Sequence, residues 1–173
     1  MHTRKRVIGI SCFMISWGLL SAAAHAAQFN GKLQVKVNIG SVCALKSGDK
    51  SVLDFGILNS LNDKDHDQQT AADSGIDIQC SKGILYRIGL GPGLHPYAPA
   101  VRQMTNGSSF IQYTLYKDSA RREWWGSLDQ RLNVLSALGN GVVQSYPIYG
   151  RIRKQATPAA GAYSDTVIVQ VSF

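Results

Sequence analysis

The sequence predicts an all-β protein whose single domain is a β-sandwich. Two observations favour this fold class. Apolar and polar residues alternate along six or seven short segments, which is the period of an extended strand. The stretches between those segments are rich in glycine, asparagine, aspartate and proline, which favour turns. Short strands separated by such turns are typical of two packed sheets.

The first 26 residues have the pattern of a secretion signal. Arg4, Lys5 and Arg6 form a basic start, residues 7–20 are mostly apolar, and residues 22–27 offer small side chains to a signal peptidase. A membrane anchor is the alternative, but the apolar run is short for a span of roughly 20 residues. We expect cleavage after Ala26 and export of the remaining chain.

Export would change the length and the charge of the protein. The full chain has 173 residues, 18 basic and 11 acidic. Loss of residues 1–26 leaves 147 residues, enough for one domain with a real core but short for two. The signal takes away three basic residues and no acidic one, so the net charge falls from +7 to +4. The longest basic run is residues 151–154, which we interpret as a solvated surface, so we expect no nucleic-acid partner.

Residues 28–40 predict an amphipathic strand at the start of the exported chain. Its large apolar side chains occupy alternate positions, so an extended backbone places them on one face. These side chains are Phe29, Leu33, Val35, Val37 and Ile39. Such a strand must bury its apolar face either in its own domain or in another copy of the chain. The first case gives a closed monomer, and the second gives a polymer subunit.

The exported chain keeps two cysteines, Cys43 and Cys80. Two cysteines in an exported domain most often bridge each other, which here closes a loop with a sequence separation of 37 residues. A metal site or a catalytic thiol is the alternative. Neither cysteine has a CxxC partner or a nearby histidine, so we expect a disulfide by elimination.

Six further segments have the alternation of strands. They are residues 51–58, 75–80, 84–90, 109–117, 141–154 and 166–173. Pro147 lies inside the fifth segment and suits an edge or a bulge, because proline cannot donate to a sheet. Residues 131–138 are the one segment that could form a helical turn or two.

Several short pieces of the exported chain stand in a recognisable order and spacing. They are residues 31–39 ahead of Cys43, 53–56, Cys80, Leu90, Gly91, Gly93, 102–104, 111–116, Trp125, Gly126, 147–152 and 161–167. In these pieces the chain resembles the spore coat protein U domain family, which includes subunits of archaic, Csu-type chaperone-usher pili. Within that family it is most similar to a major pilin.

The resemblance implies an immunoglobulin-like sandwich of the incomplete pilin type, completed by a donor strand from another subunit. Residues 27–40 would be the donor-strand extension and residues 41–173 the pilin domain. Phe29, Leu33, Val35, Val37 and Ile39 would be the donor side chains. Val167, Val169, Val171 and Phe173 would line the acceptor groove, whose other edge would be the strand around residues 42–45.

The resemblance also implies partners and a location. The partners would be other copies of the chain or sister pilins, a periplasmic chaperone and an outer-membrane usher. The chain would pass through the periplasm to a fibre on the cell surface and support adhesion and biofilm formation. Whether it is a rod subunit or a minor adaptor stays open. The alternative is a secreted monomeric sandwich that binds carbohydrate or another surface, or forms a coat, with its own strand in the groove.

The residues give no support for catalysis, a metal or a cofactor. No Gly-x-Ser-x-Gly elbow is present, and the exported chain keeps only His66 and His95. Residues 63–67 have the carboxylate spacing that opens a calcium loop, but Gln68 and Ser74 stand where glycine and the last acidic ligand are needed. We therefore expect a non-enzymatic protein with no metal site and no small-molecule cofactor.

Overall fold

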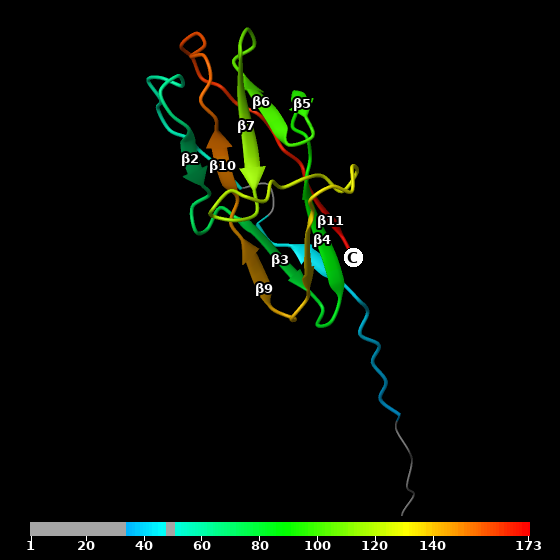
Figure 1. Cartoon of the computed structure of the whole chain (residues 1–173). Coiled ribbons are helices and arrows are strands. Elements are labelled where there is room, and N and C mark those ends of the chain that lie inside the picture. Colours follow the sequence, from blue (N-terminus) through cyan, green and yellow to red (C-terminus); the bar gives the residue numbers. More distant parts are fainter. Residues whose placement is uncertain (1–33, 48–50) are drawn as a thin grey trace, which may run out of the picture. The chain divides into compact units, whose positions relative to one another are not determined.

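The computed structural model describes residues 34–47 and 51–173, and every regular element in those ranges is a β-strand. Figure 1 labels most of them. In chain order they are β1 (Cys43–Leu45), β2 (His66–Gln69), β3 (Ile76–Cys80), β4 (Leu85–Leu90), β5 (Pro96–Ala98), β6 (Val101–Thr105), β7 (Phe110–Tyr116), β8 (Leu135–Leu138), β9 (Val143–Tyr146), β10 (Tyr149–Ile152) and β11 (Val169–Ser172). The predicted all-β fold class is confirmed.

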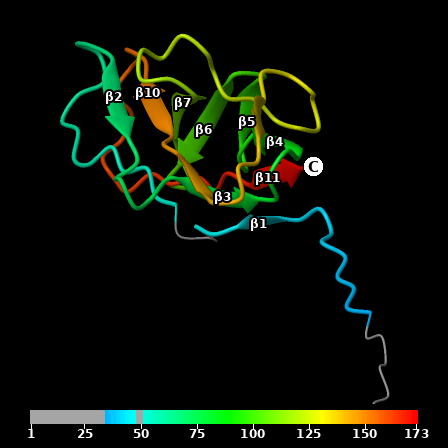
Figure 2. The ribbon, with the colours of Figure 1, turned by 90° about the horizontal axis from the view of Figure 1, so that it is seen from below.

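The strands of residues 39–173 form three hydrogen-bonded sheets with antiparallel pairing throughout. Their orders are β1-β3-β9, β2-β10-β7-β6-β5 and β11-β4-β8. In Figure 2 the five strands of the largest sheet spread across one side, and β1 and β3 lie on the other. The inward side chains of all three sheets meet in one core, as a β-sandwich requires.

The core is built on β3, in which completely buried and half-buried residues alternate, and on β4 and β7, which end in runs of buried residues. The fully buried side chains include Ile76, Ile78, Tyr86, Ile88, Leu90 and Trp125. The indole Nε1 of Trp125 donates to the backbone oxygen of Ile88 over 3.0 Å, so this large side chain is buried without an unmet donor. This core forms the floor on which the functional site lies.

The predicted disulfide between Cys43 and Cys80 is confirmed. The two residues are directly opposite each other in the pairing of β1 with β3. The bridge therefore fastens the start of the domain to a strand that has hydrogen-bonded neighbours on both sides.

Several predicted strands are confirmed, with boundaries shifted by a residue or two. Pro147 divides the segment at 141–154 into β9 and β10, which pair in different sheets. The expectation of a helical turn at residues 131–138 is wrong, because β8 forms there and pairs with β4. Periodicity also missed β2, β5 and β6, which are short and mostly polar or half-exposed.

The predicted strand at residues 51–58 is extended but belongs to no sheet. Its odd-numbered side chains as far as Phe55 are half-buried, while Val52 and Asp54 are exposed, so the face that the sequence predicts does exist. The segment lacks a neighbouring strand in the described part of the chain. The segment instead forms one edge of the groove described in the next subsection.

Candidate functional site

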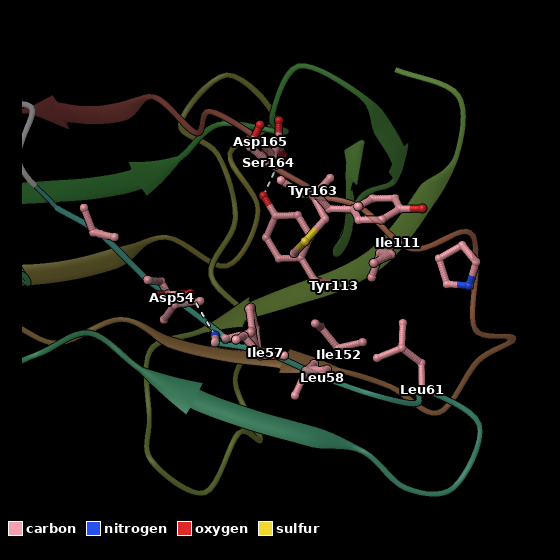
Figure 3. Close-up of a pocket in the computed structure, with 18 of the residues that line it drawn as sticks. Asp54, Ile57, Leu58, Leu61, Ile111, Tyr113, Ile152, Tyr163, Ser164 and Asp165 are labelled. Atoms are coloured by element: carbon pink, nitrogen blue, oxygen red, sulfur yellow. Dashed lines mark hydrogen bonds between the residues drawn. The ribbon is translucent and has the colours of Figure 1, made fainter. Parts of the chain in front are cut away.

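An apolar groove of about 1020 Å³ opens in the sandwich. We call residues 51–61 its first wall and residues 157–169 its second wall. The floor consists of side chains from β4, β6, β7, β10 and the turn before β10, namely Leu90, Met104, Ile111, Tyr113, Leu115, Ile148 and Ile152. Figure 3 shows side chains of the two walls on opposite sides of Ile111, Tyr113 and Ile152. The volume is at the upper end of the range for ligand pockets, and the groove is bounded by two long stretches of backbone.

The first wall is held to the sandwich by side chains. Leu53 and Phe55 lie against Gly150 of β10, where a Cβ would be 2.6 Å from Leu53 Cδ2 and 2.9 Å from Phe55 Cζ. Asp54 Oδ1 accepts from the N–H of Gly56, whose φ of 70° is in the left-handed region that glycine adopts readily. Among the described residues, 52–59 make no backbone hydrogen bond to another strand. Apart from the N–H of Gly56, residues 52–59 of this wall are therefore an edge whose backbone groups have no partner in another described strand.

Among the described residues, the backbone of the second wall pairs with β6 and β4 and with no strand on its other side. Ser164 exchanges both backbone hydrogen bonds with Thr105, at 3.1 and 3.0 Å, and the oxygen of Ile168 accepts from Gly91. Backbone groups in an extended chain point alternately to the two sides, so residues 163, 165 and 167 direct theirs away from β6 and β4. The groove therefore lies between two backbone edges, each of which can accept a strand.

A hydrogen-bonded pair joins the floor to the second wall. The Tyr113 hydroxyl donates to Asp165 Oδ2 over 2.6 Å, and both residues line the groove. Burial and this hydrogen bond raise the pKa of the Tyr113 hydroxyl, so it stays a donor at neutral pH. Asp165 also accepts from the backbone N–H groups of Leu94 and Thr166. Figure 3 marks the contact between Tyr113 and Asp165.

A buried arginine supports the floor from behind. Arg102, only 2% exposed, donates to the backbone oxygens of Leu90, Gly91 and Trp125 at 2.8 to 2.9 Å. Burial lowers the pKa of its guanidinium, while the nearby Tyr113 and Asp165 act in the opposite direction. The arginine therefore fixes the end of β4, beside the second wall, by charge-assisted hydrogen bonds.

The groove has the chemistry of a binding site for an apolar chain. Its carboxylates, Asp54 and Asp165, are occupied by hydrogen bonds to the protein itself. Within residues 34–47 and 51–173 no three His, Cys, Asp or Glu side chains are grouped so as to hold a metal ion. The same ranges contain no helix long and apolar enough to cross a membrane. An extended segment with alternating apolar side chains is the ligand that both edges and the floor would fit.

The predicted groove residues fall partly inside this site. Val167 and Val169 line the groove. Val171 lies further along β11, opposite Ile88 and packed on the core, and Phe173 is exposed at the end of the chain. Residues 42–45, expected at the other edge, are instead at β1, which pairs with β3 and does not line the groove.

The predicted donor residues can be described only in part. Phe29 and Leu33 lie outside the described residues, as does the expected signal at 1–26. Val35, Val37 and Ile39 are exposed, and residues 34–42 form no strand.

Sequence reasoning missed the first wall and the start of the second wall at residues 157–162. The alternation at 51–58 did carry a signal, since it predicted an extended apolar face. What the pattern did not show is that this segment has no partner strand within the described residues.

Residues 29–170 match the Spore Coat Protein U domain. The chain belongs to the Spore Coat Protein U domain family. The predicted family is thus confirmed over most of the chain, including both groove walls. Among curated proteins, Protein U of Myxococcus xanthus is 29% identical over 163 residues, which is 87% of this chain and 88% of that protein.

A solved structure has the same fold as this member of the Spore Coat Protein U domain family. It is the CsuC–CsuE chaperone–tip adhesion subunit pre-assembly complex from the archaic chaperone-usher Csu pili of Acinetobacter baumannii. The TM-score is 0.51 at 24% identity, over 78% of this chain and 40% of that chain. The chain thus spans less than half the length of that structure's chain, and the likeness shows the sandwich fold.

Proposed function

We propose that this chain is a structural subunit of a chaperone-usher surface fibre, assembled by donor-strand complementation. The groove between two unpaired backbone edges is the observation that carries the proposal. An inserted strand would hydrogen-bond to both walls and place its apolar side chains on the floor. The segment with that pattern is residues 28–39, with Phe29, Leu33, Val35, Val37 and Ile39 as the inserted side chains.

The reach of the chain favours insertion into another copy. Val42 is hydrogen-bonded to Ser81 beyond one end of β3, and the Ser51 hydroxyl donates to Gly75 at the other end. The six residue steps from Gly75 to Ser81 span about 20 Å of strand. Ile39 is three residues from Val42 and reaches at most about 10 Å.

The same chain's groove therefore cannot receive the whole donor pattern. Ile39, at a reach of about 10 Å, would fall short of Ser51 and Val52 in the first wall of the groove. A neighbouring copy has no such restriction. This favours a polymer over a monomer that fills its own groove.

The energetics agree with a durable fibre. Burial of five large apolar side chains contributes on the order of 10 kcal/mol before ordering costs. An empty apolar groove would favour aggregation, so a periplasmic chaperone would occupy it until assembly. The chain would be cleaved after Ala26, with residues 27–40 as the extension and 41–173 as the pilin domain. An outer-membrane usher would export the fibre, with adhesion and biofilm formation as its roles and no catalytic function.

A secreted monomeric coat or binding protein is the second candidate. Membership of a family named for a spore coat protein, with similarity to Protein U over most of both chains, is the observation that favours it. The two candidates differ in whether residues 28–39 join two molecules.

Aspartate at a donor position separates the candidates. We expect Val35→Asp or Val37→Asp to abolish SDS-resistant multimers and thin fibres, because a buried unpaired charge is costly. The chaperone-bound subunit should stay soluble. Lys36→Asp, on the opposite face of the same strand, is the matched control and should still give fibres. Electron microscopy and gels run after graded heating provide the readout. Normal fibre yield from both valine variants would overturn the proposal.

A further inference from the structure

The carboxylate of Asp165 joins three parts of the sandwich at the groove. Oδ2 accepts from the Tyr113 hydroxyl of β7 at 2.6 Å. Oδ1 accepts from the backbone N–H of Leu94 at 2.9 Å and from that of Thr166 at 2.8 Å. The side chain thus links the floor, the turn after β4 and the second wall.

Gly93 makes room for this carboxylate. Its φ of 80° is in the left-handed region, and a Cβ at this position would collide with Oδ2 of Asp165. Any side chain at residue 93 would therefore both strain the backbone and displace the carboxylate.

Asp165 also occupies the part of the second wall that faces an incoming strand. The backbone N–H and C=O of its neighbour Ser164 are both hydrogen-bonded to Thr105. Because successive residues of an extended chain point to opposite sides, the backbone groups of Asp165 point to the groove. The residue that anchors the wall internally is therefore one that would hydrogen-bond to the donor. A shift of its carboxylate would move the backbone groups that the donor must meet.

We propose that Asp165, held by Tyr113 and the turn at Gly93 and Leu94, is a positioning residue that sets the second wall at the spacing an inserted strand requires. This inference rests on the proposed function. It assigns to the contact between Tyr113 and Asp165 a role in donor binding that is separate from its role in folding.

Two phenylalanine variants separate these roles. Tyr113→Phe and Tyr86→Phe each remove one hydroxyl from a buried or nearly buried tyrosine. The hydroxyls of Tyr86 and Tyr146 are hydrogen-bonded at 2.6 Å, the same distance as between the Tyr113 hydroxyl and Asp165 Oδ2. Tyr86, however, does not line the groove. Both variants should lower the melting temperature of the subunit.

The assay uses the mature full chain, refolded with its disulfide in the presence of excess fluorescent peptide of residues 28–40. Release of the bound labelled peptide is then followed after addition of unlabelled peptide. Loss of a hydrogen bond to a charged group should speed release from Tyr113→Phe roughly tenfold or more. Release from Tyr86→Phe should stay within about twofold of the wild type, since its hydroxyl is remote from the groove.

A glycine pair provides a second test that does not depend on the folding of Tyr113→Phe. Gly93→Ala and Gly107→Ala both place a side chain at a positive φ, of 80° and 94°. Only the first meets the Asp165 carboxylate, since a Cβ at Gly107 has nothing within 4 Å. Gly93→Ala should release the peptide roughly tenfold faster, whereas Gly107→Ala should match the wild type.

The outcomes distinguish the positioning role of Asp165 from the proposed function of the chain. Equal release rates within both pairs, with a wild type that holds the peptide, would overturn the role of Asp165 and leave the proposed function standing. A wild type that does not bind the peptide would overturn the proposed function and the inference together.

Discussion

The first wall of the groove and β3 have the same sequence pattern and opposite surroundings. In both, alternate side chains turn towards the core. β3 has β1 and β9 as hydrogen-bonded neighbours, and its inward residues Ile76 and Ile78 are completely buried. Residues 52–59 of the first wall make no backbone hydrogen bond to another strand in the described part of the chain, and the inward Leu53 and Phe55 are only half-buried. Periodicity therefore fixes which face is apolar, while only neighbouring backbone makes a strand.

The largest effect should come from the disulfide that fixes β1 to β3. We expect replacement of both Cys43 and Cys80 by alanine to lower the free energy of unfolding by about 4 kcal/mol, because a loop with a separation of 37 residues is released. Urea denaturation of the monomeric, chaperone-released subunit gives the measurement. Reduced wild-type protein should lose a similar amount, and a loss below about 1 kcal/mol would contradict the prediction.

Alanine substitutions at matched inward positions measure how well β3 and the first wall are each packed against the core. Ile78→Ala should cost about 3 kcal/mol, because the side chain is fully buried in β3. Leu53→Ala in the empty subunit should cost only about 1 kcal/mol, because the first wall is half-exposed.

With a donor strand bound, the cost at Leu53 should rise towards that at Ile78. The temperature at which SDS-resistant multimers dissociate measures this second state. Equal costs at the two positions in the empty subunit would show that the first wall is already as well packed as β3.

A side chain at Gly150 should displace the first wall without touching β3. Gly150→Ala places a Cβ against Leu53 and Phe55, and overpacking of this kind costs about 1 to 3 kcal/mol. Removal of the clashing methyl groups in the double variant Gly150→Ala, Leu53→Ala should give less loss than the sum of the single variants. Thermal melts of the four proteins test this, and strictly additive losses would count against contact between the wall and β10.

The smallest effect should come from the ion pairs that hold β2 to β10. Arg151 donates to both carboxylate oxygens of Asp67 at 2.6 and 2.7 Å, and this hydrogen bonding lowers the pKa of Asp67. A lowered pKa contributes stability that is present above the ordinary value of about 4 and is lost as the pH falls through the lowered value.

Asp67→Asn should therefore destabilise the protein at pH 7 by less than about 1 kcal/mol, because the pair is partly exposed. The difference from the wild type should vanish near pH 2 and shrink in 1 M salt. Urea midpoints at the two pH values provide the check, and a difference that persists at low pH would refute the assignment to this pair.

Much of the sandwich could be predicted from local pattern, because buried strands repeat with a period of two. β3, β4, β7 and β11 all lie within segments that the alternation marked. The strands at residues 66–69 and 96–98 carry few apolar residues and pair at the edges of their sheet, so local pattern gave no signal for them. At residues 131–138 the pairing with β4 prevailed over a weak helical pattern.

The groove residues, too, could be predicted only in part from the sequence. Val167 and Val169 were expected as groove residues because the resemblance to pilins implies a groove along the last strand. Residues 42–45 were expected at the other edge because the same resemblance implies that the first strand of the domain lies there. The structure gives that place to the first wall, since β1 is already paired with β3 and fastened by the disulfide.

By itself, the sequence determined the all-β class, the apolar faces, the bridge between Cys43 and Cys80 and the family. The class, the faces and the bridge follow from residue type and spacing along the chain, and the family follows from the resemblance to its known members. Only the tertiary structure decided that residues 51–61 and 157–169 form the two edges of one groove. It also decided that Asp165 meets Tyr113 and Gly93 there. Backbone pairing between distant segments depends on which edges the folded sheets leave free, and no local pattern records that.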